Sequence, residues 1–94
     1  MKYNIKLTTQ FKKDYKTILK QGFDPKKLEN VLELLQNGSH IPDIYKDHPL
    51  WNSKDFKNCR ELHIEPNLLL IYKYSNEYLI LYLIRMGSHS ELFI

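Results

Sequence analysis

The sequence has little with which to form covalent cross-links or cross a membrane. Cys59 is its only cysteine, which excludes an internal disulfide and a cysteine-rich zinc site and fits a reducing compartment. The longest uninterrupted apolar run, 78–84, has seven residues, far fewer than the roughly 20 that span a bilayer as a helix. The N-terminus also lacks the apolar block of a signal peptide. We therefore expect a cytoplasmic protein with no membrane partner.

The chain also lacks repeats, low-complexity tracts and any stretch that reads as a linker. Its 94 residues are enough for one domain with a modest core. We therefore expect a single domain spanning residues 1–94.

Acidic residues are scarce in the first third of the chain. Residues 1–30 carry eight lysines against three acidic residues, whereas residues 31–94 carry six basic against eight acidic ones. A basic N-terminal third suggests a polyanionic partner, nucleic acid first. The alternative is a lysine-rich helix face that is merely solvated.

The spacing of apolar residues predicts a strand followed by two helices. Residues 2–7 alternate apolar and polar side chains. A helix capped by Thr8 or Thr9 then ends at Gly22, and Asp24-Pro25 opens a second helix that closes at 37–38. The apolar stripe of the first helix leaves a basic outer face, which makes four lysines candidates for binding RNA or the ribosome: Lys12, Lys13, Lys16 and Lys20.

The second half of the chain has the period-two pattern of strands. Residues 39–55 read as a long loop with at most a short strand near 45–48. Strands are expected at 58–64, 68–74 and 78–85, and the residues after Gly87 are expected to form a short edge strand. The predicted fold is α+β, with two N-terminal helices packed on one face of a small antiparallel sheet in the order β-α-α-β-β-β.

Side chains suited to metal-free phosphodiester chemistry gather at the ends of the predicted strands. RNA cleavage without metal requires a base for the 2′-OH, an acid for the leaving 5′ oxygen and positive charge for the phosphorane. Glu61 and His63 share one face of a strand, Arg85 ends another strand and His89 follows it, and His48 lies in the preceding loop.

Each of these residues also has a structural alternative. His63 could be a half-exposed strand residue, and Arg85 could form a salt bridge with Glu61 or Glu65. The spacing of the four histidines matches neither a helical HExxH site nor a zinc finger. We therefore expect no metal and no cofactor.

The chain resembles YafQ-type toxins of the RelE/ParE superfamily of toxin–antitoxin modules. The resemblance covers most of the sequence. Its matching stretches are Phe11–Asp14, Tyr45–Leu50, Arg60–Pro66, Leu69–Lys73 and Arg85–Phe93.

This resemblance implies a function as well as a fold. Members of the family are ribosome-dependent endoribonucleases that cut mRNA in the ribosomal A site without metal and so slow translation. Each is held inactive by a cognate antitoxin, and operator DNA is bound only through the antitoxin complex.

The resemblance also assigns roles to individual side chains. It makes His89 the general acid, Arg85 the group that stabilises the phosphorane and Phe93 a stacking platform for a base. His48 and His63 would position or activate the 2′-OH, and Glu61 would orient His63 or act as the base.

The sequence departs from the family pattern after Pro66. The family usually has Asp and then Trp there, whereas this chain has Asn67 and Leu68. An amide accepts no proton at neutral pH. We therefore expect an active but attenuated nuclease. Two alternatives remain: a ParE-like toxin that cuts nothing, and a regulatory module that binds the antitoxin without cleaving RNA.

Overall fold

The computed structural model describes residues 2–51 and 53–93, which form five strands, two long helices, a short helix and a 3-10 turn. The elements follow one another as β1 (Asn4–Leu7), α1 (Thr9–Lys20), α2 (Pro25–Gln36), η1 (Asp43–Tyr45), β2 (His48–Pro49), β3 (Arg60–Glu65), β4 (Leu68–Ser75), β5 (Ile80–Gly87) and α3 (His89–Leu92). In the described ranges no helix is both long and apolar enough to cross a membrane. The α+β class and the helix–helix–sheet order predicted from the sequence are confirmed.

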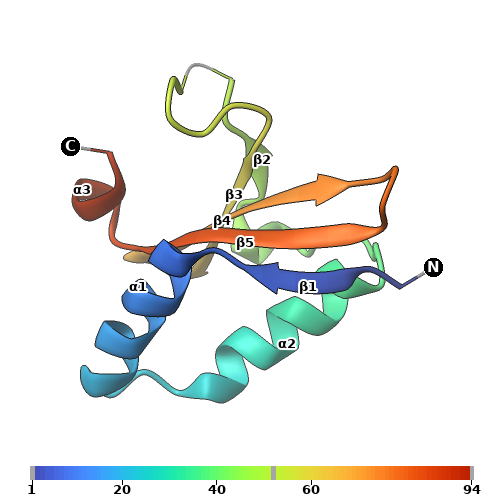
Figure 1. The fold of residues 1–94 in the computed structure, drawn as a ribbon. Helices are drawn as coiled ribbons and strands as arrows, with labels where there is room; N and C mark the ends of the chain where they lie inside the picture. The colour runs from blue at the N-terminus through green and yellow to red at the C-terminus, as the bar shows by residue number, and fades with distance from the viewer. Residues whose placement is uncertain (1, 52, 94) are drawn as a thin grey trace.

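One mixed sheet contains all five strands, in the spatial order β1-β5-β4-β3-β2 (Figure 1). Strands β2 to β5 pair antiparallel as predicted, but β1 pairs parallel to β5. The expectation of a wholly antiparallel sheet was therefore wrong for its first strand. Parallel neighbours need a crossover connection, and here α1, α2 and the later strands lie between β1 and β5 in the chain.

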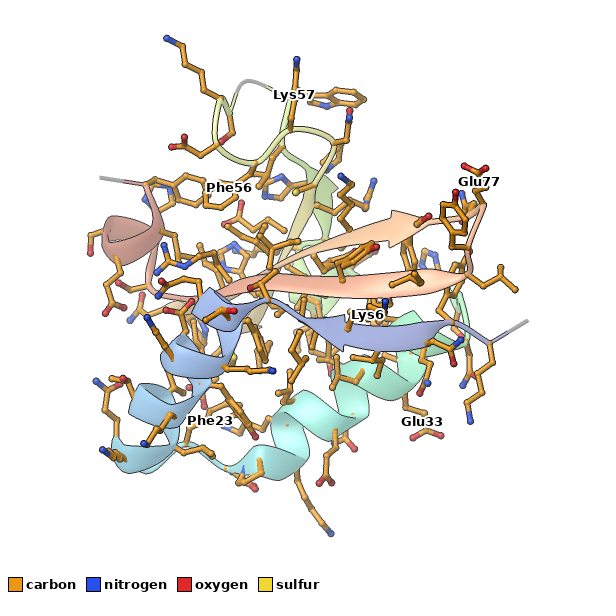
Figure 2. All side chains as sticks on the ribbon, viewed as in Figure 1. Lys6, Phe23, Glu33, Phe56, Lys57 and Glu77 are labelled. Carbon is orange, nitrogen blue, oxygen red and sulfur yellow. The ribbon has the colours of Figure 1, made fainter. Side chains whose placement is uncertain are left out.

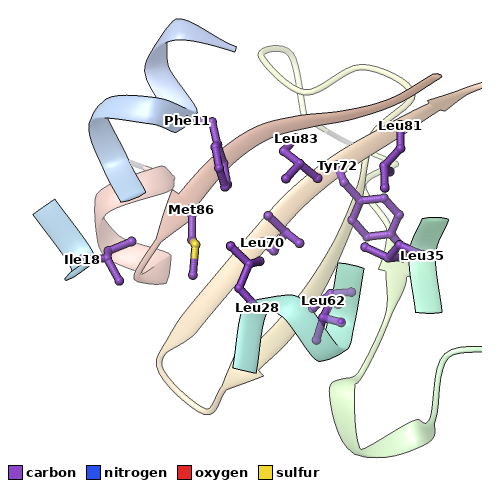
Figure 3. Close-up of a cluster of buried hydrophobic side chains, with 11 residues drawn as sticks. Phe11, Ile18, Leu28, Leu35, Leu62, Leu70, Tyr72, Leu81, Leu83 and Met86 are labelled. Atoms are coloured by element: carbon purple, nitrogen blue, oxygen red, sulfur yellow. The ribbon is translucent and has the colours of Figure 1, made fainter. Parts of the chain in front are cut away.

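The helices α1 and α2 cover one face of the sheet, where the larger core lies (Figures 1 and 3). Apolar residues at helical spacing on α1 and α2 meet alternate residues of the strands. We call this the helix-side core: Phe11, Ile18, Leu28, Val31, Leu35, Leu62, Leu70, Tyr72, Leu81, Leu83 and Met86.

A smaller cluster lies on the opposite face, beneath the loop 50–58 and α3. We call it the loop-side core: Phe56, Cys59, Leu69, Ile71 and Leu92, with Leu50, Ile84 and Phe93 packed against it. Strand β4 supplies both cores, because residues 69–72 alternate between the faces and all are at most 1% exposed. Figure 2 shows Phe56 reaching from the loop toward α3.

The C-terminal residues form α3 rather than the predicted edge strand. The Ser88 hydroxyl accepts a hydrogen bond from the Glu91 backbone N–H, and the Glu91 side chain accepts one from the Ser88 N–H. This reciprocal capping box starts a helical turn. A Cβ added at Gly87 would lie 3.3 Å from the Leu92 Cδ2 atom, so the glycine allows α3 to pack closely on the end of β5.

Candidate active site

His48, Glu61 and His63 form a compact cluster on the loop side of the sheet. His48 and Glu61 face each other as partners in the β2–β3 ladder, and the His48 Nε2 atom lies 3.2 Å from the Glu61 Oε2 atom. His63 is two residues further along β3 and so points to the same face. One ligand atom from each residue lies within 4.8 Å of the others. The structure thus brings together three of the side chains selected from the sequence.

The two imidazoles are oriented by backbone carbonyls of neighbouring prolines. The His48 Nδ1 atom lies 3.1 Å from the Pro49 carbonyl oxygen, and the His63 Nδ1 atom lies 3.4 Å from that of Pro66. With Nδ1 donating its hydrogen, Nε2 is the atom left for chemistry. The His48 Nε2 atom faces the Glu61 Oε2 atom across 3.2 Å, so a proton on that nitrogen would be donated to the carboxylate.

Glu61 is unusual because it is an ionisable residue in a buried position. It is 5% exposed, whereas the His48 side chain is 49% exposed. Burial of a carboxylate costs free energy unless it is paired and hydrogen-bonded. The His48 imidazole supplies that partner, and it remains accessible to solvent on its other side.

His89 and Phe93 form a second group at the end of β5. They lie one turn apart on α3 with ring centroids 4.9 Å apart, and Phe93 also packs edge-on against Phe56 with centroids 5.6 Å apart. In the sheet, His63 pairs with Leu69 and Leu69 pairs with Gly87. Two strand spacings, roughly 10 Å, therefore separate the backbones of His63 and Gly87.

The pairing register shifts in two strand pairs close to His63 and Arg85. The β3–β4 register shifts between His63 and Glu65, and the β4–β5 register shifts between Ile71 and Tyr72, opposite Arg85. Bulges redirect side chains and are common next to active sites. The site thus lies where β3 and β5 both depart from regular pairing.

Arg85 is held by Asp14 of α1 rather than by Glu61 or Glu65, the partners considered from the sequence. Its Nε atom is 2.8 Å and its Nη2 atom 3.1 Å from the two Asp14 carboxylate oxygens, and the Met86 N–H donates to the same carboxylate. The hydrogen bonds to Asp14 raise the pKa of Arg85. The guanidinium is thereby fixed at the edge of β5.

Asn67 lies in the β3–β4 turn beside Pro66, whose carbonyl oxygen is 3.4 Å from the His63 Nδ1 atom, whereas the basic helix face lies across the sheet. Asn67 lines a hollow with the α1–α2 connection, Ser88 and Glu91, and His63 is not among the residues of that hollow. The four lysines of α1 are exposed, and α1 packs on the opposite face of the sheet from Glu61 and His63. The structure therefore places the four lysines of α1 away from the histidines.

Comparison with known proteins shows the family. The model for "Bacterial toxin of type II toxin-antitoxin system, YafQ" matches residues 3–94. The chain belongs to the YafQ toxin family. The mRNA interferase toxin YafQ of Escherichia coli (strain B / BL21-DE3) is 40% identical over 91 residues, covering 96% of this chain and 95% of that protein. The resemblance inferred from the sequence is confirmed.

Solved structures of related toxins share the fold. A metal-bound toxin from Helicobacter pylori has a TM-score of 0.89 and 42% identity, covering 97% of this chain and 99% of that one. The E. coli DinJ–YafQ toxin–antitoxin complex matches with a TM-score of 0.87 and 37% identity over all of both chains.

The donor atoms in this YafQ-family chain suit a transition metal. Two imidazole nitrogens and a carboxylate oxygen within 4.8 Å of one another are ligands that Zn²⁺ and Cu²⁺ accept. The carbonyls of Pro49 and Pro66 provide the outer hydrogen bonds that ligating histidines commonly have. His48, Glu61 and His63 are therefore the residues that would hold a metal.

Sequence reasoning missed Asp14 and Asp47 as supporting residues. Both lie in stretches that resemble the family, Phe11–Asp14 and Tyr45–Leu50, so a signal was present without an assigned role. Asp14 binds Arg85 from 71 positions away, and Asp47 binds Arg60 and Tyr72 from 13 and 25 positions away. Pairs at such separations depend on the tertiary fold and do not follow from local spacing.

We expect the Asp14→Asn substitution to destabilise the protein in a pH-dependent way. Burial alone would raise the pKa of Asp14, but hydrogen bonds from Arg85, Gln10 and the Met86 backbone lower it below its usual 3.8. A carboxyl with a lowered folded-state pKa contributes stability above its unfolded pKa and loses it as the pH falls. The parent should therefore exceed Asp14→Asn by about 1–3 kcal/mol near neutral pH.

Urea unfolding from neutral pH down to about pH 3 measures this difference, which should shrink below the ordinary carboxyl range. Asp43→Asn is the matched control, because Asp43 is exposed and its variant should show a flat profile. An equal loss for Asp14→Asn at every pH would contradict the assignment.

Proposed function

We propose that this chain is a ribosome-dependent endoribonuclease that cuts mRNA in the ribosomal A site and so inhibits translation. The observation that supports this proposal most is the His48–Glu61–His63 cluster, which lies two strands from Gly87, after which His89 begins α3. The E. coli relatives named mRNA interferase toxins support the same activity.

The proposed reaction is a transesterification that needs no metal. The 2′-oxygen attacks the adjacent phosphorus while the 5′-oxygen leaves, which forms one P–O bond and breaks another. Glu61, oriented by His48 and His63, takes the 2′-OH proton, and His89 gives a proton to the leaving oxygen. Arg85 stabilises the charge on the phosphorane, and Phe93 stacks on a base.

A purified translation system tests this proposal. Toxin stripped of metal with EDTA, desalted and then added to ribosomes stalled on a defined mRNA in Mg²⁺ buffer should produce new 5′ ends at the A-site codon as efficiently as untreated toxin. No such ends should form when ribosomes are omitted. Inhibition of DNA gyrase supercoiling with no cut in the mRNA would favour the ParE-like alternative.

An antitoxin is the proposed protein partner. The E. coli relative forms the DinJ–YafQ toxin–antitoxin complex. By this likeness we propose that a cognate antitoxin holds the present toxin inactive, and that operator DNA is bound only through the complex.

The lysines of α1 are proposed to bind ribosomal RNA. They are exposed on the face of the molecule away from the histidine cluster, so they suit phosphates of the surrounding ribosome better than the cleaved strand. Charge reversal at Lys12, Lys13 and Lys16 should weaken ribosome binding about tenfold or more at low salt and much less at high salt, since released counterions drive such binding. Co-sedimentation measures it, and an equal loss at all salt concentrations would count against the role.

Activity is proposed to be attenuated because Asn67 replaces the usual aspartate. Asn67→Asp should raise the cleavage rate by about tenfold if a second carboxylate assists proton removal. The matched control is Asn76→Asp, which makes the same change in the β4–β5 hairpin far from the site. No gain would argue that Asn67 is not what limits cleavage.

Transition-metal binding is a second candidate function. It is favoured by the ligand geometry of His48, Glu61 and His63 and by the metal-bound H. pylori toxin. A bound metal would occupy the nitrogen and oxygen lone pairs that accept protons, so it would inhibit cleavage. Calorimetric titration with Cu²⁺ should give one site in the parent and at least tenfold weaker binding in His48→Gln. Equal binding by His40→Gln and His48→Gln would place the metal elsewhere.

A further inference from the structure

Strand β2 holds His48 with very little backbone pairing. It has only two residues, His48 and Pro49, which pair with Glu61 and Arg60. Pro49 has no backbone N–H to donate. On the N-terminal side, Lys46 has a left-handed φ of 51°, a conformation that costs free energy for a non-glycine residue. Something other than the ladder must keep His48 beside Glu61.

The preceding residue, Asp47, is anchored by side chains of two other strands. The Arg60 Nη2 atom lies 2.9 Å from one carboxylate oxygen of Asp47, and the Nε atom lies 3.4 Å from the other. The Tyr72 hydroxyl donates a hydrogen bond to the same carboxylate. Arg60 and Tyr72 are themselves partners in the β3–β4 ladder. The three side chains therefore tie the start of β2 to the middle of the sheet.

Packing in the core holds the Tyr72 side chain of this network in place. It is 1% exposed and belongs to the helix-side core. Burial, and then the hydrogen bond to Asp47, raise the pKa of Tyr72, so its hydroxyl stays protonated and remains a donor. Arg60 supplies a permanent charge, and a bidentate arginine–carboxylate pair is directional as well as strong.

Asp47 immediately precedes β2, so its anchoring also fixes the position of His48. Consecutive residues of an extended backbone point to opposite faces of the sheet. Asp47 meets Tyr72 of the helix-side core, so His48 points to the loop side, where it meets Glu61. A shift in Asp47 would therefore move the imidazole directly. We propose that Asp47, held by Arg60 and Tyr72, is the positioning residue that keeps His48 against Glu61 and His63.

The activity test of this inference rests on the proposed nuclease function and uses a double-mutant cycle. Asp47→Asn keeps the shape of the side chain but removes the charge that binds Arg60. It should lower kcat for mRNA cleavage on ribosomes about tenfold or more, with KM changed by less than about threefold, because small misplacements of a catalytic group are costly. In a His48→Ala background the same substitution should change kcat by less than about twofold, because its effect passes through His48.

Two further variants separate positioning from general damage. Asp43→Asn alters an exposed aspartate of the adjacent η1 turn and should leave kcat unchanged. Tyr72→Phe removes only the hydroxyl. In the parent it should lower kcat by part of the amount that Asp47→Asn does, and in the His48→Ala background it should leave kcat unchanged. If Asp47→Asn does not fold, the cycle of Tyr72→Phe with His48→Ala tests on its own whether the network acts through His48.

Imidazole signals test the inference without any cleavage assay. In NMR spectra of the carbon-bound imidazole protons, Asp47→Asn should shift the His48 ring signals and leave those of His89 in place. The NMR measurement can be made even if the parent cuts no mRNA. It therefore separates failure of this inference from failure of the proposed function. The proposal is overturned if the His48 signals stay unmoved, or if Asp47→Asn lowers kcat equally with and without His48.

Discussion

Replacing His89 by alanine is expected to lower mRNA cleavage by about 10²–10⁴-fold, which is the usual contribution of a positioned general acid. His89 is exposed at the first turn of α3, so its removal should change the free energy of unfolding by less than about 0.5 kcal/mol. The loss should therefore be chemical. Mapping of mRNA 5′ ends after induction in cells, together with a rate measurement on purified ribosomes, provides the check.

His40→Ala is the matched control for this experiment. His40 is also exposed, but it lies with Asp43 and Arg60 around a different hollow, on the loop before η1. Its variant should cut the same codons at the parental rate. Cleavage by His89→Ala within threefold of the parent would remove His89 from the mechanism and leave the acid to be sought among His48 and His63.

Replacing Glu61 by leucine is expected to abolish cleavage while preserving or raising stability. The carboxylate is 5% exposed and lies on the face that carries the loop-side core. Replacing a whole buried ion pair by apolar residues is often neutral or stabilising by about 1–4 kcal/mol, whereas removing one partner is costly because it leaves the other charge buried and unpaired. His48 is half exposed and can turn to water when its partner is removed. Activity and stability should therefore move in opposite directions.

Thermal unfolding and ribosome-dependent cleavage of the same preparation measure both effects. Glu65→Leu is the control, because that carboxylate is more exposed and forms a surface ion pair with Lys27. It should change both quantities little. If Glu61→Leu strongly destabilises the protein, the carboxylate has a structural role that the cluster geometry does not account for.

Local patterns in the sequence were sufficient to predict most of the helices and strands. Thr8 and Asp24 accept hydrogen bonds from the first turns of α1 and α2, as their residue types predict. Period-two alternation placed Glu61 and His63 on one face of β3. What local patterns could not supply is the neighbour of each strand, and so the parallel pairing of β1 with β5 was missed.

Two differences between sequence and structure near the C-terminus have separate physical causes. The apolar residues Leu92 and Phe93 favour a strand after Gly87, although Ser88 and Glu91 carry the spacing of a capping box. Glu61 and Glu65 were the salt-bridge partners considered for Arg85 as a structural alternative, but α1 brings Asp14 to the edge of β5 where β1 has ended. The helical turn had a visible signal in the sequence, whereas the Asp14 pairing required the tertiary arrangement.

The position of the last strand has a consequence for synthesis of the toxin. Strand β5 lies between β1 and β4, so the N-terminal strand has no partner until nearly the whole polypeptide has been made. Such non-local pairing delays folding until the distant segments can meet. A nascent polypeptide that stops short of β5 therefore lacks the β1–β5 and β4–β5 ladders, and β1 stays unpaired until the residues of β5 can reach it.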